Sequence, residues 1–99
     1  MQLGQNKIFV FTPKKQVIVL PEHSTPIDFA FAVHSDLGMK CERAKVNGKI
    51  VQLHYLLQNT DSVEIMIAKK VQVKRHWLNF VKTTKAQAKI RQCLGIKIM

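Results

Sequence analysis

Short apolar runs bounded by turn signals occupy most of the first 68 residues of the chain. Two such runs, residues 7–12 and 17–20, are rich in β-branched and aromatic side chains and are separated by Pro13-Lys14-Lys15-Gln16. Runs of this length and composition on either side of a turn are typical of a β-hairpin. The pattern therefore predicts an N-terminal hairpin.

A second hairpin is predicted around Asn47-Gly48-Lys49. Residues 44–46 and 50–53 are rich in apolar side chains and flank this tripeptide, and Asn-Gly between two such runs is the strongest short-range hairpin signal. Residues 62–68 then alternate apolar and polar positions, which predicts a final strand. On one face of that strand we expect Val63, Ile65 and Ile67.

The segment between the two hairpins has the start and stop signals of a helix. Thr25 can cap it, Pro26 can occupy its first position, and Asp28 lies three residues after the cap, as in a capping box. Apolar residues follow at helical spacing, and Gly38, which can adopt the left-handed conformation, is the expected end. We predict one helix over residues 26–37 that covers a sheet. Its last turn collects the polar residues His34, Ser35 and Asp36.

These elements, in the order hairpin, helix, hairpin and strand, predict an α+β fold of the ubiquitin-like β-grasp kind. The 99 residues allow one domain, or a small domain with an appendage. The only apolar run near the start, residues 8–11, is too short for a signal peptide or a membrane span. Cys41 and Cys93, without a secretory signal, fit reduced thiols. We therefore predict a cytoplasmic protein and no membrane partner.

The last third of the chain differs in pattern. Residues 69–74 indicate a basic linker, residues 75–81 a short amphipathic turn or helix, and Thr83 or Thr84 can cap a second helix that runs to about Leu94. Apolar residues are few in that helix, and isolated helices of this length are marginally stable in water. We expect this segment to lack a packing partner.

Charge divides the chain at the same place. Up to Glu64 there are seven Lys/Arg and six Asp/Glu, whereas from Ile65 onward there are nine Lys/Arg and no Asp/Glu. This excess of positive charge in the tail predicts a polyanionic or acidic partner. Alternatively, the basic side chains form an ordinary solvated helix face. The basic residues of the tail that we single out are Lys69, Lys70, Lys74, Arg75, Lys82, Lys85, Lys89 and Arg91.

Catalytic and metal-binding motifs are not found in the sequence. The histidines and cysteines have no CxxC, HxxxH or HExxH spacing, and the four glycines form no phosphate-binding loop. His34 and Cys41 would make a base and a nucleophile, but no orienting third residue accompanies them. We expect no catalytic residue, no metal and no cofactor.

Four segments, taken in their order along the chain, together resemble the TGS domain. A fifth resembles the segment that joins TGS to the following helical domain in RelA/SpoT-type (p)ppGpp synthetase/hydrolases. The first four are NKIFVFTPK (6–14), STPIDFAFAVHSDLG (24–38), AKVNGKIV (44–51) and SVEI (62–65), and the fifth is WLNFVKTTKAQAKIRQ (77–92). The resemblance implies a β-grasp TGS domain over residues 6–68. Residues 69–99 would then be a basic linker and a truncated helical segment.

The resemblance also implies a function. The hydrolase and synthetase domains of that family precede the TGS domain, so we expect a non-catalytic regulatory module or fragment, whether an excised piece or a natural short reading frame. In RelA-type members TGS contacts the 3′ CCA end of uncharged tRNA on the ribosome through the histidine of an HSD motif, and in SpoT-type members it is associated with acyl carrier protein. The other domains of the parent enzyme would be further partners. The matching positions are His34, Ser35 and Asp36, with phosphate contacts expected from Lys40, Lys45 and Lys49.

Two other interpretations stay open from the sequence: a stand-alone basic RNA-binding β-grasp module, or a nonfunctional remnant of a split gene. His34 would then simply complete the packing or the dipole interactions at a helix end. The family often has glycine where this chain has Lys15, His23 and Thr60, each in a predicted turn, and a positive φ there would cost about 1 kcal/mol. In addition, His76 stands where the family often has aspartate.

Overall fold

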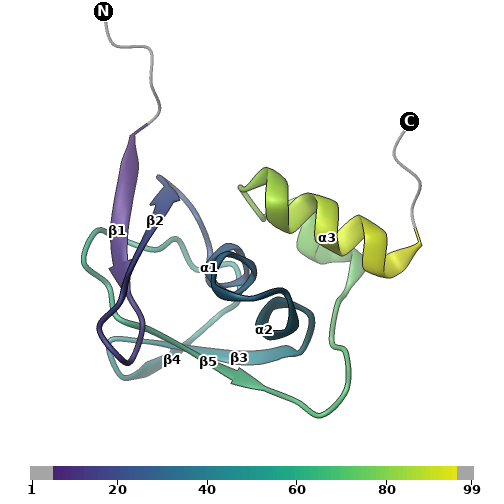
Figure 1. Ribbon diagram of the computed structural model, residues 1–99, viewed down its shortest axis with the longest axis horizontal. Helices are drawn as coiled ribbons and strands as arrows, with labels where there is room; N and C mark the ends of the chain where they lie inside the picture. The colour runs from purple at the N-terminus through teal and green to yellow at the C-terminus, as the bar shows by residue number, and fades with distance from the viewer. Residues whose placement is uncertain (1–5, 96–99) are drawn as a thin grey trace, which may run out of the picture.

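The computed structural model describes residues 6–95 and has an α+β architecture (Figure 1). The strands and helices predicted from the apolar pattern are present, with changes at the helix end and in the tail. In chain order, the elements are β1 (Lys7–Phe11), β2 (Val17–Pro21), α1 (Pro26–Val33), α2 (Ser35–Met39), β3 (Cys41–Val46), β4 (Lys49–Val51), β5 (Val63–Ile67), the 3-10 helix η1 (Arg75–Asn79) and α3 (Thr84–Leu94).

Both predicted hairpins are confirmed. β1 pairs antiparallel with β2, with Phe9 opposite Val19. β3 and β4 are joined by Asn47 and Gly48, whose φ angles of 53° and 85° are both positive, as a two-residue hairpin turn that matches the twist of the strands requires. β4 is shorter than expected because it ends at Val51.

The two hairpins are connected through the chain that leads into β5. β5 pairs antiparallel with β3, and Ser62 forms a parallel bridge with Phe11 of β1. The Phe11 N–H donates to the Asp61 carbonyl at 2.9 Å. The strands thus follow one another in space as β2, β1, β5, β3 and β4, with the chain before β5 beside β1, which confirms the predicted ubiquitin-like β-grasp arrangement.

The predicted capping box begins α1. The Thr25 side chain accepts from the Asp28 N–H, and the Asp28 carboxylate accepts from the Thr25 N–H at 2.9 Å. The prediction of one helix over residues 26–37 is wrong, because the chain is extended at His34 (φ −165°, ψ 140°) and then begins the separate helix α2.

Gly38 has a different role from the left-handed helix end that we expected. It lies inside α2 and is buried against the ring of Phe31 in α1. A Cβ at this position would overlap that ring. The glycine therefore allows α2 to approach α1 closely, and the break at His34 lets the chain turn back to make this contact.

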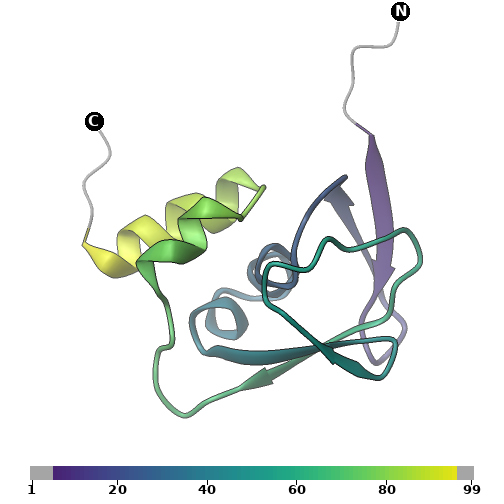
Figure 2. The ribbon, with the colours of Figure 1, turned by 180° about the vertical axis from the view of Figure 1, so that it is seen from behind.

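The basic tail is docked, so the expectation that it lacks a packing partner is wrong. Trp77 of η1 and Ile90 of α3 are buried in one cluster with Ile27 and Phe31 of α1. Phe29 faces the other core cluster, formed with the strands. Figures 1 and 2 show α1 and α2 between the strands β3 and β5 and the tail helix α3. Helix α1 is thus covered from two directions, which its apolar sequence permits.

A buried carboxylate links the tail to α1. The Asp28 side chain is fully buried and accepts hydrogen bonds from the Lys82 N–H at 2.9 Å and the Thr83 N–H at 2.8 Å, in addition to those of the capping box. The Thr83 hydroxyl also donates to Asp28 at 2.9 Å and accepts from the Ala86 N–H at 3.1 Å. Thr83 is therefore the cap of α3.

Candidate partner-binding surface

His34 lies at the junction between α1 and α2 and is exposed. Its backbone N–H closes α1 by donating to the Ala30 carbonyl at 3.0 Å. Its side chain caps α2, because Nδ1 accepts from the Asp36 N–H at 3.0 Å. A neutral imidazole that accepts at Nδ1 carries its proton on Nε2. The cap therefore fixes the ring and leaves Nε2 as the donor for a ligand.

The neighbouring predicted residues share this short helix. Ser35 is the first residue of α2 and is half-buried, Asp36 is exposed in its first turn, and Lys40 follows its last residue. At about 1.5 Å per residue, Lys40 lies roughly 9 Å along the helix axis from His34. The structure thus brings four of the predicted residues together on one element.

Lys45 and Lys49 are placed elsewhere. Lys45 is near the far end of β3, at roughly 16 Å along the strand from Lys40 at about 3.3 Å per residue, and Lys49 begins β4 beyond the hairpin turn. Lys45 is also half-buried and opposite Glu64 of β5, so a carboxylate offsets its charge. These two lysines are not part of the His34 surface.

The basic residues of the tail lie on the linker, on η1 and on α3, apart from Lys82, which lies between η1 and α3. Lys89 and Arg91 are half-buried beside the apolar face of α3, and Lys97 lies outside the described residues. The linker itself is tied to α2, because the Gln72 N–H donates to the Met39 carbonyl at 2.7 Å. The exposed basic side chains are Lys69, Lys70, Lys74, Arg75, Lys82 and Lys85.

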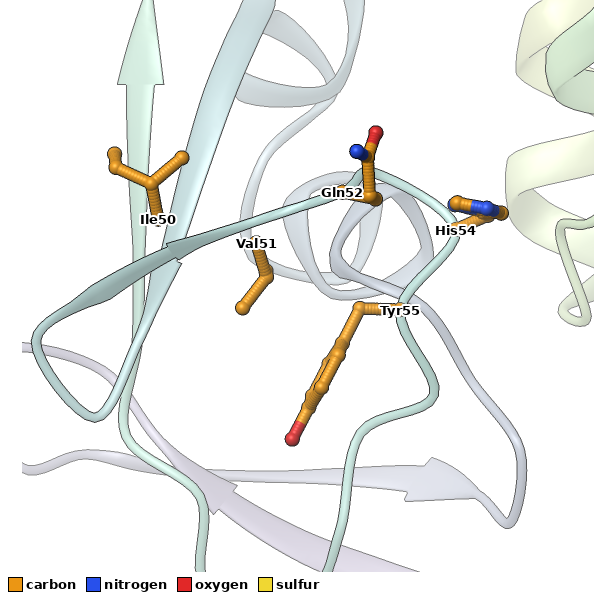
Figure 3. Close-up of a pocket in the computed structure, with 5 residues that line it drawn as sticks. All are labelled: Ile50, Val51, Gln52, His54 and Tyr55. Carbon is orange, nitrogen blue, oxygen red and sulfur yellow. The ribbon is translucent and has the colours of Figure 1, made fainter.

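A hollow that the sequence did not reveal follows β4. It has a volume of about 480 Å³ and is lined by the residues of Figure 3. The side chains of Val51 and Tyr55 point to the same side of the chain there, whereas His54 points toward the ribbon of η1 and α3. A second hollow, of about 290 Å³, lies on that side of His54 and is lined by Gln52, Leu53, His54, His76, Trp77 and Phe80. The sequence indicated the segment around His76, Trp77 and Phe80 as an amphipathic turn, but it gave no signal that this segment meets Gln52 and His54.

The two thiols differ in accessibility. Cys41 is fully buried at the start of β3, and this burial raises the pKa of its thiol to about 12. Cys93 on α3 is exposed. Among residues 6–95 no cluster of three or more His, Cys, Asp or Glu side chains is placed to hold a metal ion. In the same part of the chain no helix has the length and apolarity needed to cross a membrane.

Comparison with known proteins assigns the family. The TGS domain pattern matches residues 8–67. Over 91 residues the chain is 50% identical to a GTP pyrophosphokinase of Myxococcus xanthus, and over 92 residues it is 47% identical to the bifunctional (p)ppGpp synthase/hydrolase RelA of Mycobacterium tuberculosis. The alignments cover 92% and 91% of this chain. The chain spans only 12% of the length of either relative.

A solved structure agrees with this assignment. The crystal structure of a GTP-binding protein from Pyrococcus horikoshii matches with a TM-score of 0.59 and 30% identity, over 63% of this chain and 21% of that one. The matched part of the relatives is a TGS domain, and no catalytic domain is evident in it. The chain belongs to the TGS domain family, and its TGS domain is of the type found in RelA/SpoT (p)ppGpp synthetase/hydrolases.

Proposed function

We propose that this chain is a non-catalytic sensing module that binds the 3′ CCA end of uncharged tRNA through the surface of α2, with His34 as the central contact. The observation that carries the proposal is the geometry of His34. Its Nδ1 is occupied by the Asp36 N–H at 3.0 Å, and the side chain is exposed between two helices. One face of a fixed imidazole can stack on an unpaired base, while Nε2 donates to a base edge, a 2′-OH or a phosphate.

The position of α2 in the fold supports a sensing role. α2 contacts α1 through Gly38 and Phe31, and the chain after β5 is bonded to it through Gln72. A ligand that alters α2 would therefore act on the segment that leads into the tail. In the RelA/SpoT enzymes such a module would relay tRNA binding to catalytic domains, which lie outside the matched 12% of the relatives.

Acyl carrier protein is the competing partner for the same module. Both it and tRNA are acidic, and both would be attracted to a chain of formal charge +10. The imidazole geometry favours an RNA end, because stacking and donation by one fixed ring suit an unpaired base better than a carboxylate. Basic residues of the docked tail, such as Lys82 and Lys85, support a second function, nonspecific RNA binding, which depends more steeply on salt.

Binding measurements at an ionic strength of about 0.15 M, where long-range charge effects are screened, test the proposal. The purified chain is titrated with deacylated tRNA, tRNA without its CCA end, and acyl carrier protein. We expect intact tRNA to bind more tightly than trimmed tRNA by roughly 5- to 100-fold, the scale of one base stacked on a ring. Equal binding of intact tRNA, trimmed tRNA and unrelated RNAs would instead show nonspecific binding.

Variants of His34 separate ligand contact from helix capping. His34→Ala removes both the ring and the cap, whereas His34→Asn removes the ring and keeps a good capping acceptor. We expect both variants to lose the preference for the CCA end and His23→Asn, in an exposed turn after β2, to keep it. If His34→Asn binds like the original chain, His34 acts only as a cap. If acyl carrier protein binds and tRNA does not, the tRNA assignment is wrong.

A further inference from the structure

The hollow between the loop after β4 and η1 is lined by four rings from two segments of the chain. The ring centroids of His54 and Phe80 are 5.9 Å apart with an interplanar angle of 56°, and those of His76 and Phe80 are 6.2 Å apart at 60°. Phe80 is thus in contact range of both imidazoles. The amide of Gln52, the side chain of Leu53 and the indole of Trp77 complete the lining of this space of about 290 Å³.

The accessibility of these side chains suits a ligand site. His54, His76 and Gln52 are exposed and Phe80 is half-buried. Trp77, in contrast, is 2% exposed and belongs to the cluster that joins α1 and α3. The rings of His54, His76 and Phe80 are therefore accessible to solvent, and the buried Trp77 beneath them is held in place by the core.

The charge around the hollow favours an anionic ligand. Lys74 and Arg75 are exposed and directly precede His76. The chain from Ile65 onward contains no Asp or Glu. A ligand that carries phosphates on either side of a planar ring would match both the rings and these cations.

We propose that this hollow binds an unpaired nucleobase of single-stranded RNA. The base stacks on the ring of Phe80 and meets the two tilted histidine rings edge to face. The Gln52 amide donates to and accepts from the edge of the base, and Lys74 and Arg75 contact the flanking phosphates. An acidic peptide would leave the rings without a stacking partner. The site is separate from His34 on α2, and the inference does not rest on the proposed function.

Fluorescence of Trp77 tests the proposal directly, because it is the only tryptophan of the chain and lines the hollow. The full chain is titrated with hexaadenylate RNA, with inorganic polyphosphate of similar charge, and with a hexaglutamate peptide. We expect the RNA to change the fluorescence of Trp77 and to bind at least about 5-fold more tightly than polyphosphate, because the bases contribute stacking. Equal affinity for RNA and polyphosphate, or tighter binding of the peptide, overturns the proposal.

Matched substitutions locate the site. Phe80→Leu removes the ring and keeps an apolar side chain, and we expect it to weaken hexaadenylate binding roughly 5- to 100-fold. The same substitution at Phe9, which is 49% exposed on β1, is expected to leave it unchanged. His76→Asp removes a ring and adds a negative charge that repels phosphate, and is expected to weaken binding at least about 5-fold. Circular dichroism confirms folding, and if folded Phe80→Leu and His76→Asp bind RNA like the original chain, the hollow is not the site.

Discussion

Replacing Asp28 with alanine is expected to loosen the attachment of the tail to the β-grasp unit. This buried carboxylate accepts from the backbone N–H groups of Thr25, Lys82 and Thr83 at 2.8 to 3.0 Å. It also accepts from the hydroxyls of Thr25 and Thr83. Its removal leaves the first turn of α1 and the segment before α3 without their shared acceptor.

The magnitude follows from the donors left behind. A buried donor without a partner costs about 1–3 kcal/mol. Water can reach Lys82 and Thr83 once the side chain is gone, because their bonds are only partly buried, so the low end applies to them. Three backbone donors then give about 3–5 kcal/mol, a large share of the roughly 5–15 kcal/mol that stabilises a domain. Asp28→Asn keeps one acceptor oxygen and is expected to cost about half as much.

Urea unfolding, followed by circular dichroism, measures the loss of free energy, and amide hydrogen exchange at Lys82 and Thr83 shows where it arises. The matched control is Asp36→Ala in the first turn of α2, which is exposed and is expected to cost about 0.5 kcal/mol through the helix dipole. A loss below about 1 kcal/mol for Asp28→Ala, with unchanged exchange at both amides, would refute the view that Asp28 holds the tail in place.

Thr60 has a φ of 70°, so Thr60→Gly is expected to raise the free energy of unfolding by up to about 1 kcal/mol, measured by urea unfolding; a loss of stability would contradict this. Gly38→Ala places a Cβ against the ring of Phe31 and is expected to cost about 1–3 kcal/mol in the same assay, whereas no loss would mean that the two helices can separate freely. In the native chain a thiol reagent is expected to label Cys93 and to spare Cys41 until unfolding. Because burial raises the pKa of the Cys41 thiol from 9.0 to about 12, the unfolded chain loses this proton first. Stability should therefore fall between these pH values by up to about 1.4 kcal/mol per unit, and Cys41→Ala, but not Cys93→Ala, should make that fall shallower.

Local signals in the sequence were sufficient for much of the fold. The Asn47-Gly48 turn has the positive φ angles that its residue types favour, and the Thr25–Asp28 capping box begins α1 as predicted. Lys15, His23 and Thr60, each in a predicted turn, have φ angles of 67°, 74° and 70°. Each of these features is decided within a few residues, and for that reason sequence patterns predict them.

Features that depend on distant contacts were missed. The partners of Asp28 at Lys82 and Thr83 lie 54 and 55 residues away, so its spacing from Thr25 revealed only the cap. Likewise, the expected helix end at Gly38 was wrong because the glycine serves the contact with Phe31 rather than a local turn. The hollow beside Phe80 combines segments before β5 and after it, and no local pattern indicates such a pairing.

Of the predicted site residues, the sequence could group only those that are close together in the chain. Ser35 and Asp36 belong to α2, and His34 and Lys40 are its N-terminal and C-terminal caps. The pattern could not show that the His34 ring caps that helix, because the break in the chain at His34 depends on how α2 packs against α1. Nor could it show that Lys45 is opposite Glu64, which depends on the register between β3 and β5.

The most direct test of the central claim combines the His34→Asn substitution with removal of the CCA end from tRNA, and compares four dissociation constants. If the His34 ring binds the CCA end, each change alone weakens binding, and the two together weaken it no further than either one, which corresponds to a coupling of about 1–3 kcal/mol. If the two losses simply add, His34 and the CCA end do not interact, and the account of this surface is wrong.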